Sequence, residues 1–284
     1  MSALVPARIG ANAAAEDLLA RGFVILKGVV DPLVIERLDA DLAPDFAATP
    51  SSVGPFYGTG TVRFGRLLTR SRQMQAVVLN PVTIALAEVL LRWHRGLQLD
   101  FTQAIAVAPG TRPQAPHRDG EMWPLPRPRG EHLVNVILPL TTFSEQTGAT
   151  QVWAMSHRGA AAPTESVPTT AAMMPGDALV FLGSTLHRQG ANTSEETRRA
   201  VVVGYSAAWL KPSENQTLSY PPAVARDFPH PLARLIGYER IAPNLNNYDC
   251  RCPSELLGSG ARGAVDRLHP EQVAALKRHF DVDA

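Results

Sequence analysis

A run of short strand-like segments between residues 97 and 207, separated by turns that contain glycine or proline, constrains the fold more than any other feature. The first segment, Leu97–Val107, alternates apolar and polar side chains with period two, which is typical of a strand with one buried face. Further strands are predicted at His132–Leu140, Thr150–Ala154, Ala178–Leu182 and Arg199–Ala207. Because no long helical pattern lies between these segments, we expect a sandwich or closed double sheet rather than a parallel nucleotide-binding sheet.

The segments that precede the β region predict helices around one early strand. The expected elements are a helix at Ala13–Arg21, a strand at Gly22–Lys27, a helix capped by Asp31 with Pro32 at its first position, and helices at Arg70–Leu79 and Pro81–Trp93. From Lys211 onward the chain is rich in proline and asparagine, and a last helix is predicted at Pro270–Phe280.

These patterns predict one domain over residues 1–284, divided into three parts. A helical flank covers about 1–96, the β core covers about 97–210, and a C-terminal excursion that packs back onto the core covers 211–284. The resulting fold class is mainly β with flanking helices.

Charge and cysteine content exclude several classes of function. The 27 Lys and Arg residues nearly balance the 26 Asp and Glu residues, which argues against a dedicated nucleic-acid binder and against a polybasic membrane anchor. Cys250 and Cys252 are too few for a disulfide framework or a structural zinc site. Neither a secretory leader nor a membrane-spanning stretch is evident, so a cytoplasmic location is expected.

A His-x-Asp pair, His117 and Asp119, follows the first strand and a Pro/Gly loop. Residues two apart in an extended chain point to the same side, so an imidazole nitrogen and a carboxylate oxygen can converge on one divalent metal ion. Taken alone, the pair is better explained by a hydrogen bond in a surface loop.

His187 and Arg198 extend this pair into a site. His187 starts a later strand and can supply the third ligand of a two-histidine, one-carboxylate set, which leaves coordination positions open and suits Fe(II). Arg198 can bind a carboxylate through two parallel hydrogen bonds. Arg199 follows directly, and strand alternation allows one of the two to point inward; we assign Arg198 on spacing, against the alternative of a solvated charged pair.

In combination, these motifs make the chain resemble the phytanoyl-CoA dioxygenase family of Fe(II)/2-oxoglutarate oxygenases, over about residues 22–210. The motifs that carry the resemblance are Gly22–Gly28, Gln114–Asp119, Asn135–Leu140, Glu145–Thr150, Ser156-His157, Pro175–Asp177, His187 and Arg198. The resemblance implies a double-stranded β-helix core of the jelly-roll, cupin-like type. It also implies iron held by His117, Asp119 and His187, with dioxygen as oxidant and the distal carboxylate of 2-oxoglutarate on Arg198.

Weaker assignments also come from the resemblance. Gln114, Asn135 and Thr150 would help to hold the cosubstrate, although each is also readable as a structural polar group. Retention of Asp119 favours oxygen chemistry, because halogenating relatives usually have a small residue there. The segment Val152-Trp-Ala-Met-Ser-His157 departs from the Val-x-Pro-Gly-Ser-His common in relatives, which affects the local backbone and no assigned ligand, and we interpret His157 as a polar group in a turn.

The expected activity is hydroxylation of an unactivated C–H bond in a small, largely apolar metabolite, with release of succinate and CO2. Residues assigned to the substrate pocket are Tyr57, Phe101, Gln103, Met122 and Trp123, each of which is also consistent with ordinary packing. No basic cluster stands out as a coenzyme A site, although Arg70, Arg72, Arg127 and Arg129 leave an acyl-CoA substrate open.

Alternative activities remain consistent with the same residues. Desaturation, rearrangement or epoxidation in specialised-metabolite biosynthesis would use the same ligands. A non-catalytic, cupin-like metal-binding module would not need Arg198, which argues against that class. The resemblance implies that a homodimer is possible, which the sequence itself does not indicate.

Overall fold

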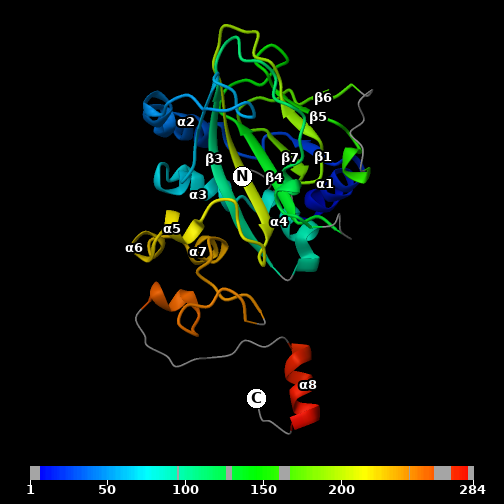
Figure 1. Ribbon diagram of the computed structural model, residues 1–284, viewed down its shortest axis with the longest axis vertical. Helices are drawn as coiled ribbons and strands as arrows, with labels where there is room; N and C mark the ends of the chain where they lie inside the picture. Colours follow the sequence, from blue (N-terminus) through cyan, green and yellow to red (C-terminus); the bar gives the residue numbers. More distant parts are fainter. Residues whose placement is uncertain are drawn as a thin grey trace, which may run out of the picture.

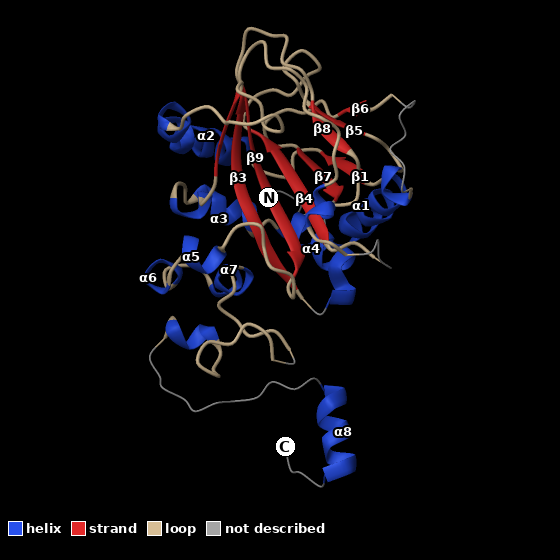
Figure 2. Cartoon of the chain, viewed as in Figure 1, coloured by secondary structure: helices blue, strands red, loops and turns tan. Residues whose placement is uncertain are grey.

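The computed structural model describes residues 7–94, 96–125, 130–159, 167–242, 244–258 and 270–280. Two antiparallel sheets form its centre (Figures 1 and 2). The large sheet has the order β1 (Phe23–Leu26), β7 (Ala178–Leu182), β4 (Leu133–Pro139), β9 (Arg198–Ala207), β3 (Leu97–Val107) and β2 (Thr61–Phe64). The small sheet has the order β6 (Thr169–Thr170), β5 (Thr150–Val152) and β8 (His187–Gln189).

Residues 111–117 extend the small sheet beyond β8. The backbone N–H of Asn192 donates to Thr111 O (3.0 Å), and the backbone N–H of Gln114 donates to Gln189 O (3.1 Å). His117 and His187 exchange two backbone hydrogen bonds of 3.0 Å each. From β3 to β9 the chain thus alternates between the two sheets, with β5 and β6 as one antiparallel pair. This alternation is that of a double-stranded β-helix, and the predicted fold class is confirmed.

Helices cover the outer face of the large sheet (Figure 1). They are α1 (Ala7–Arg21), α2 (Pro32–Ala48), α3 (Gln73–Val78) and α4 (Pro81–Leu91), with the 3-10 turns η1 (Leu67–Thr69) and η2 (Arg92–His94). Asp31 caps α2 by accepting from Leu33 N (2.9 Å), and Asn80 caps α4 by accepting from Val82 N (3.0 Å). Leu86 of α4 packs with outward-facing sheet residues such as Val136 and Val203 in one apolar cluster.

The chain after β9 returns along the lower end of the large sheet. It forms α5 (Gln216–Ser219), α6 (Pro222–Ala225), α7 (His230–Leu235) and the 3-10 turn η5 (Pro253–Leu256); α8 (Pro270–Phe280) lies apart from them in Figure 1. Buried Tyr220 and Leu232 join this segment to the helical cluster. No helix within the described ranges is both long and apolar enough to cross a bilayer.

Element boundaries differ from the sequence expectation in a few places. The first helix begins at Ala7 rather than Ala13, β9 begins at Arg198, and the strand predicted to reach Ala154 ends at Val152. The edge strand β2 was missed because Thr61–Phe64 is too short to show a period.

Met155 has a left-handed backbone, with φ of 60°, and precedes η4 (Ser156–Arg158). Glycine is common here in the sequence pattern that the resemblance implies. The side chain is 59% exposed, while the amide donates to Arg21 O (2.7 Å). A non-glycine residue at this position therefore introduces backbone strain.

Replacing Met155 by glycine is expected to raise the free energy of unfolding by about 0.5–1 kcal/mol, because relief of the left-handed strain exceeds the extra flexibility of the unfolded chain. Urea denaturation measures this change. Met174 is the matched control: it is 56% exposed and lies outside the left-handed region, so Met174→Gly should bring no gain. Equal effects of the two substitutions would contradict the strain at residue 155.

Candidate active site

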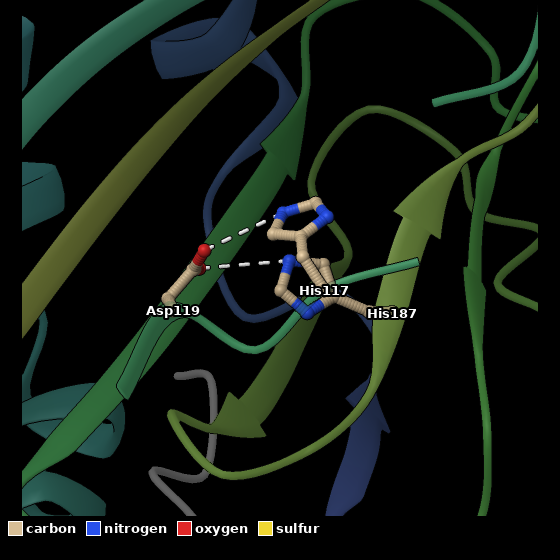
Figure 3. Close-up of side chains that lie close together, drawn as sticks. All are labelled: His117, Asp119 and His187. Carbon is tan, nitrogen blue, oxygen red and sulfur yellow. Dashed lines mark ion pairs between the residues drawn. The ribbon is translucent and has the colours of Figure 1, made fainter. Parts of the chain in front are cut away.

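Two imidazoles and one carboxylate meet between the sheets (Figure 3). His117 ends the 111–117 segment, Asp119 begins the 3-10 turn η3 (Asp119–Met122), and His187 begins β8. His117 Nε2 lies 3.5 Å from Asp119 Oδ1, and His187 Nε2 lies 3.5 Å from Asp119 Oδ2. One ligand atom from each residue falls within 4.8 Å of the others, so all three can contact one metal ion.

Backbone contacts fix the orientation of both imidazoles. His117 Nδ1 lies 2.9 Å from Ala115 O, and His187 Nδ1 lies 3.1 Å from Thr185 O. Because a carbonyl oxygen accepts and never donates, each Nδ1 carries the proton and each Nε2 presents its lone pair toward Asp119. Burial, together with the neighbouring His187, lowers the pKa of His117 despite the opposing charge of Asp119. The neutral form thus favoured is the form that binds metal.

Asn135 of β4 orients the carboxylate of the cluster. Its Nδ2 donates to Asp119 Oδ2 (2.7 Å), and its side chain is fully buried. We predicted a cosubstrate contact for this residue; the structure places its amide on Asp119, and the cosubstrate contact stays a prediction.

A cavity of about 510 Å³ opens beside the cluster. Of the predicted residues, it is lined by His117, Asp119, His187, Arg198, Gln114, Thr150, Tyr57, Phe101, Gln103 and Met122. Trp123 is not among the lining residues: its indole N–H donates to Lys211 O (3.0 Å) and its ring stands edge-on to His132. A second cavity, of about 740 Å³, lies between α4, α7 and the segment after β9, and contains none of the three ligand candidates. We therefore place the site in the smaller cavity.

Arg198 is the inward-facing member of the arginine pair. It is 4% exposed, its Nη1 donates to Gly148 O (2.9 Å), and its guanidinium lies over the Phe143 ring at 4.5 Å. Its buried Nε has no hydrogen-bond partner within the described residues. Burial and, to a smaller degree, the charge of Arg63 lower the pKa of Arg198 to about 9, so the group is still a cation at neutral pH. Arg199 points the other way and pairs with Asp39 of α2 (2.6 Å).

Gly148 is required at the contact with Arg198. Its φ is +76°, and a Cβ there would lie 2.8 Å from Gly190 O. No other residue type fits without moving the backbone that holds the Arg198 guanidinium.

Arg63 of β2 is a cavity residue that the sequence reading missed. Its Nη1 donates to Gln103 Oε1 (3.0 Å), and its guanidinium lies 4.6 Å from the Tyr57 ring centroid. Burial lowers the pKa of Arg63, while Tyr57 and Asp119 act in the opposite direction. A lone arginine inside the apolar stretch Thr61–Phe64 was the available signal, and it carried no weight because β2 itself was not recognised.

Several known proteins are similar to this chain in sequence or structure. Residues 19–200 match the family model described as phytanoyl-CoA dioxygenase (PhyH). The chain is 31% identical to dioxygenase aneA of Aspergillus aculeatus over 230 residues, covering 74% of this chain and 77% of that protein. It is 29% identical to dioxygenase olcK of Penicillium canescens over 241 residues, covering 78% and 79%. The epimerase SnoN, solved with Fe3+, alpha ketoglutarate and nogalamycin RO, matches with a TM-score of 0.60 at 20% identity, covering 71% of this chain and 85% of that one.

A double-stranded β-helix with two histidines and one carboxylate lining its cavity is typical of non-haem iron oxygenases. The chain belongs to the phytanoyl-CoA dioxygenase family and is an iron- and 2-oxoglutarate-dependent dioxygenase, as its sequence predicted. The residues present fit these cofactors: two nitrogens and a carboxylate converge for iron, and a buried arginine with a free donor is available for a carboxylate.

Asn135→Ala is expected to weaken Fe(II) binding by about 10–100-fold, because the carboxylate of Asp119 loses the amide that orients it. Anaerobic competition with a chromogenic chelator measures this affinity. Gln151→Ala on β5 removes a half-buried amide that contacts Arg188 instead, and it should leave the affinity unchanged. Parental Fe(II) affinity in Asn135→Ala would contradict the orienting role.

Proposed function

We propose that the protein hydroxylates an unactivated C–H bond of a small, largely apolar metabolite and converts 2-oxoglutarate to succinate and CO2. The observation that carries this proposal is the placement of the His117–Asp119–His187 cluster and of Arg198 in one cavity of about 510 Å³. A cavity of this size accommodates a mid-sized organic molecule beside a cosubstrate.

In this proposal His117 and His187 hold iron through Nε2, and Asp119 holds it through a carboxylate oxygen. Together, bound iron and 2-oxoglutarate supply the chemistry that activates dioxygen and removes a hydrogen atom from the substrate. The Nδ1–H contacts with Ala115 O and Thr185 O keep both rings in position, and Asn135 does the same for Asp119.

Arg198 binds the distal carboxylate of 2-oxoglutarate, with Thr150 and Gln114 as polar neighbours in the same cavity. Arg63 adds a second positive charge to it. The buried Arg198 and the half-buried Arg63 suit a dianionic cosubstrate, because the dianion would supply the opposite charge that the desolvated Arg198 guanidinium needs.

The substrate occupies the part of the cavity bordered by Tyr57, Phe101 and Met122, with Gln103 as a hydrogen-bonding group. The similar structure of SnoN, an epimerase from nogalamycin biosynthesis, supports a specialised metabolite as substrate. Arg70 pairs with Asp45, which leaves less free charge for coenzyme A phosphates, while Arg127 and Arg129 fall outside the described residues. A free small molecule is therefore favoured over an acyl-CoA thioester. The homodimer, the single domain and the cytoplasmic location stay predictions.

An anaerobic titration with Fe(II) and 2-oxoglutarate should show the weak visible charge-transfer band of the chelate, and His117→Ala or Asp119→Ala should abolish it. Arg198→Ala should weaken 2-oxoglutarate binding about 10–100-fold, as expected for a lost hydrogen bond to a charged group. Arg199→Ala is the matched control, since Arg199 pairs with Asp39 on the other face of β9, and its affinity should be parental. If all variants behaved like the parent protein, the proposed ligands would be wrong.

Substrate class and outcome are tested by a panel of neutral terpenoids, alkaloids and aromatic polyketides, with 2-oxoglutarate consumption as the signal. At least one compound should stimulate consumption above the substrate-free rate. Its product should gain one oxygen; loss of two hydrogens would indicate desaturation, and unchanged mass would indicate rearrangement. Absence of stimulation, together with absence of 2-oxoglutarate binding, would favour the metal-binding module.

A further inference from the structure

Part of the cavity lining comes from a segment that belongs to neither sheet. After β9, residues 208–216 turn back across the sheet, and Ser213 and Glu214 reach the cavity wall. The same segment contacts the turn that follows Asp119: Lys211 O accepts from the Trp123 indole, and Ser213 Oγ lies 3.9 Å from Met122 Sδ. Contacts that hold residues 208–216 in place therefore also determine the shape of this part of the cavity.

Asp100 of β3 holds the segment after β9 in place through hydrogen bonds. Ser213 N donates to Asp100 Oδ1 (3.1 Å), and the Ser213 hydroxyl donates to Oδ2. The main-chain oxygen of Asp100 accepts from Glu214 N (3.1 Å) and Gln216 Nε2 (3.0 Å). A fifth bond comes from Ser206 Oγ on β9 (3.1 Å). The side chain is fully buried, and a buried carboxylate of this kind is sustained by its hydrogen bonds.

A β-bulge explains why an aspartate in the middle of a strand can reach this segment. The pairing of β3 with β9 shifts between Leu99 and Phe101, so Asp100 is an extra residue in the ladder. Leu99 consequently packs with the helices, whereas Phe101, two positions later, faces the cavity. Opposite the Phe101 ring stands Gly204, where a Cβ would lie 2.6 Å from the ring.

Glu214 completes the attachment on the other side of the cavity wall. Its carboxylate accepts from Arg66 N (2.8 Å) and Thr102 N (3.3 Å). Gly65 leaves the room for it, since a Cβ there would lie 2.8 Å from Glu214 Oε1. Three parts of the chain, residues 65–66, 100–102 and 213–216, are thereby joined around the cavity wall.

We propose that Asp100 is a positioning residue for substrate recognition, which holds Ser213, Glu214 and Phe101 as one rigid wall against an apolar substrate. The inference rests on the proposed function, because the wall borders the same substrate. Cosubstrate binding at Arg198 does not involve these residues. Loss of the Asp100 contacts should therefore impair substrate use and leave 2-oxoglutarate binding intact.

The test compares Asp100→Asn, Ser213→Ala and the double variant, each loaded with iron and 2-oxoglutarate. Asp100→Asn should speed amide hydrogen exchange at residues 213 and 214. It should also raise the half-saturating concentration of the stimulating panel compound about tenfold, the effect of one hydrogen bond to a charged group. Both substitutions act on the hydrogen bond between the Ser213 hydroxyl and the Asp100 side chain, so their effects should not add, and the double variant should be no worse than the poorer single one. The 2-oxoglutarate titration midpoint should stay within about twofold in all three, since Arg198 is untouched.

Ser206→Ala is the control, because it removes a hydroxyl from the same carboxylate on the β9 side and leaves the 213–216 contacts in place. It should keep the half-saturating concentration near the parental value. Faster exchange at residues 213 and 214 with unchanged half-saturation in Asp100→Asn would overturn the proposal. An equal loss of 2-oxoglutarate affinity would also overturn it.

A failure of the proposed function is recognised separately, as absence of stimulation of the parent protein by every panel compound. In that case the cavity wall is tested with Nile red, a neutral apolar dye that is similar in size to a small apolar metabolite. About tenfold weaker dye binding by Asp100→Asn and Ser213→Ala, with parental binding by Ser206→Ala, supports the wall. Equal dye binding by all variants rejects it.

Discussion

The pairing of residues 111–117 with β8 is the constraint on which the site depends. Two backbone hydrogen bonds between His117 and His187 join segments that are distant in the sequence, and they set both imidazoles side by side. The same pairing determines the position of Asp119, because this residue lies two positions after His117, and its carboxylate contacts both imidazoles. The alternation of strands between the two sheets is what brings these segments together. The ligand cluster is thus a property of the fold more than of any local motif.

Charge is distributed unevenly around the cavity. Arg198 and Arg63 place positive charge on its lining, while Phe101, Tyr57 and Met122 make other parts of the wall apolar. Glu214 also lines the cavity, and the backbone amides of Arg66 and Thr102 donate to its carboxylate oxygens. A dianion and an apolar molecule can therefore be bound in one cavity, each at the surface that suits it.

Much of the candidate site was predictable from the sequence, because binding iron and a carboxylate requires particular residue types. His117, Asp119, His187 and Arg198 could be named from the sequence, and the alternation in Leu97–Val107 predicted the sheet. Features that depend on tertiary contacts could not be predicted from the sequence. The four residues of β2 are too few to show a period, so Arg63 was missed. The sequence does not indicate which atom the side-chain amide of Asn135 will contact. The bulge at Asp100 depends on how β3 pairs with β9, which the sequence of β3 alone does not show.

The contact between Arg198 and Gly148 has a consequence for binding kinetics and entropy. The Gly148 carbonyl and the Phe143 ring immobilise the guanidinium before any ligand arrives. The conformational entropy of a long side chain is consequently lost during folding and not during association. A flexible ammonium at the same place would lose that freedom at each encounter, so in the role that we propose for Arg198 a rigid side chain favours fast and repeatable binding over many catalytic cycles.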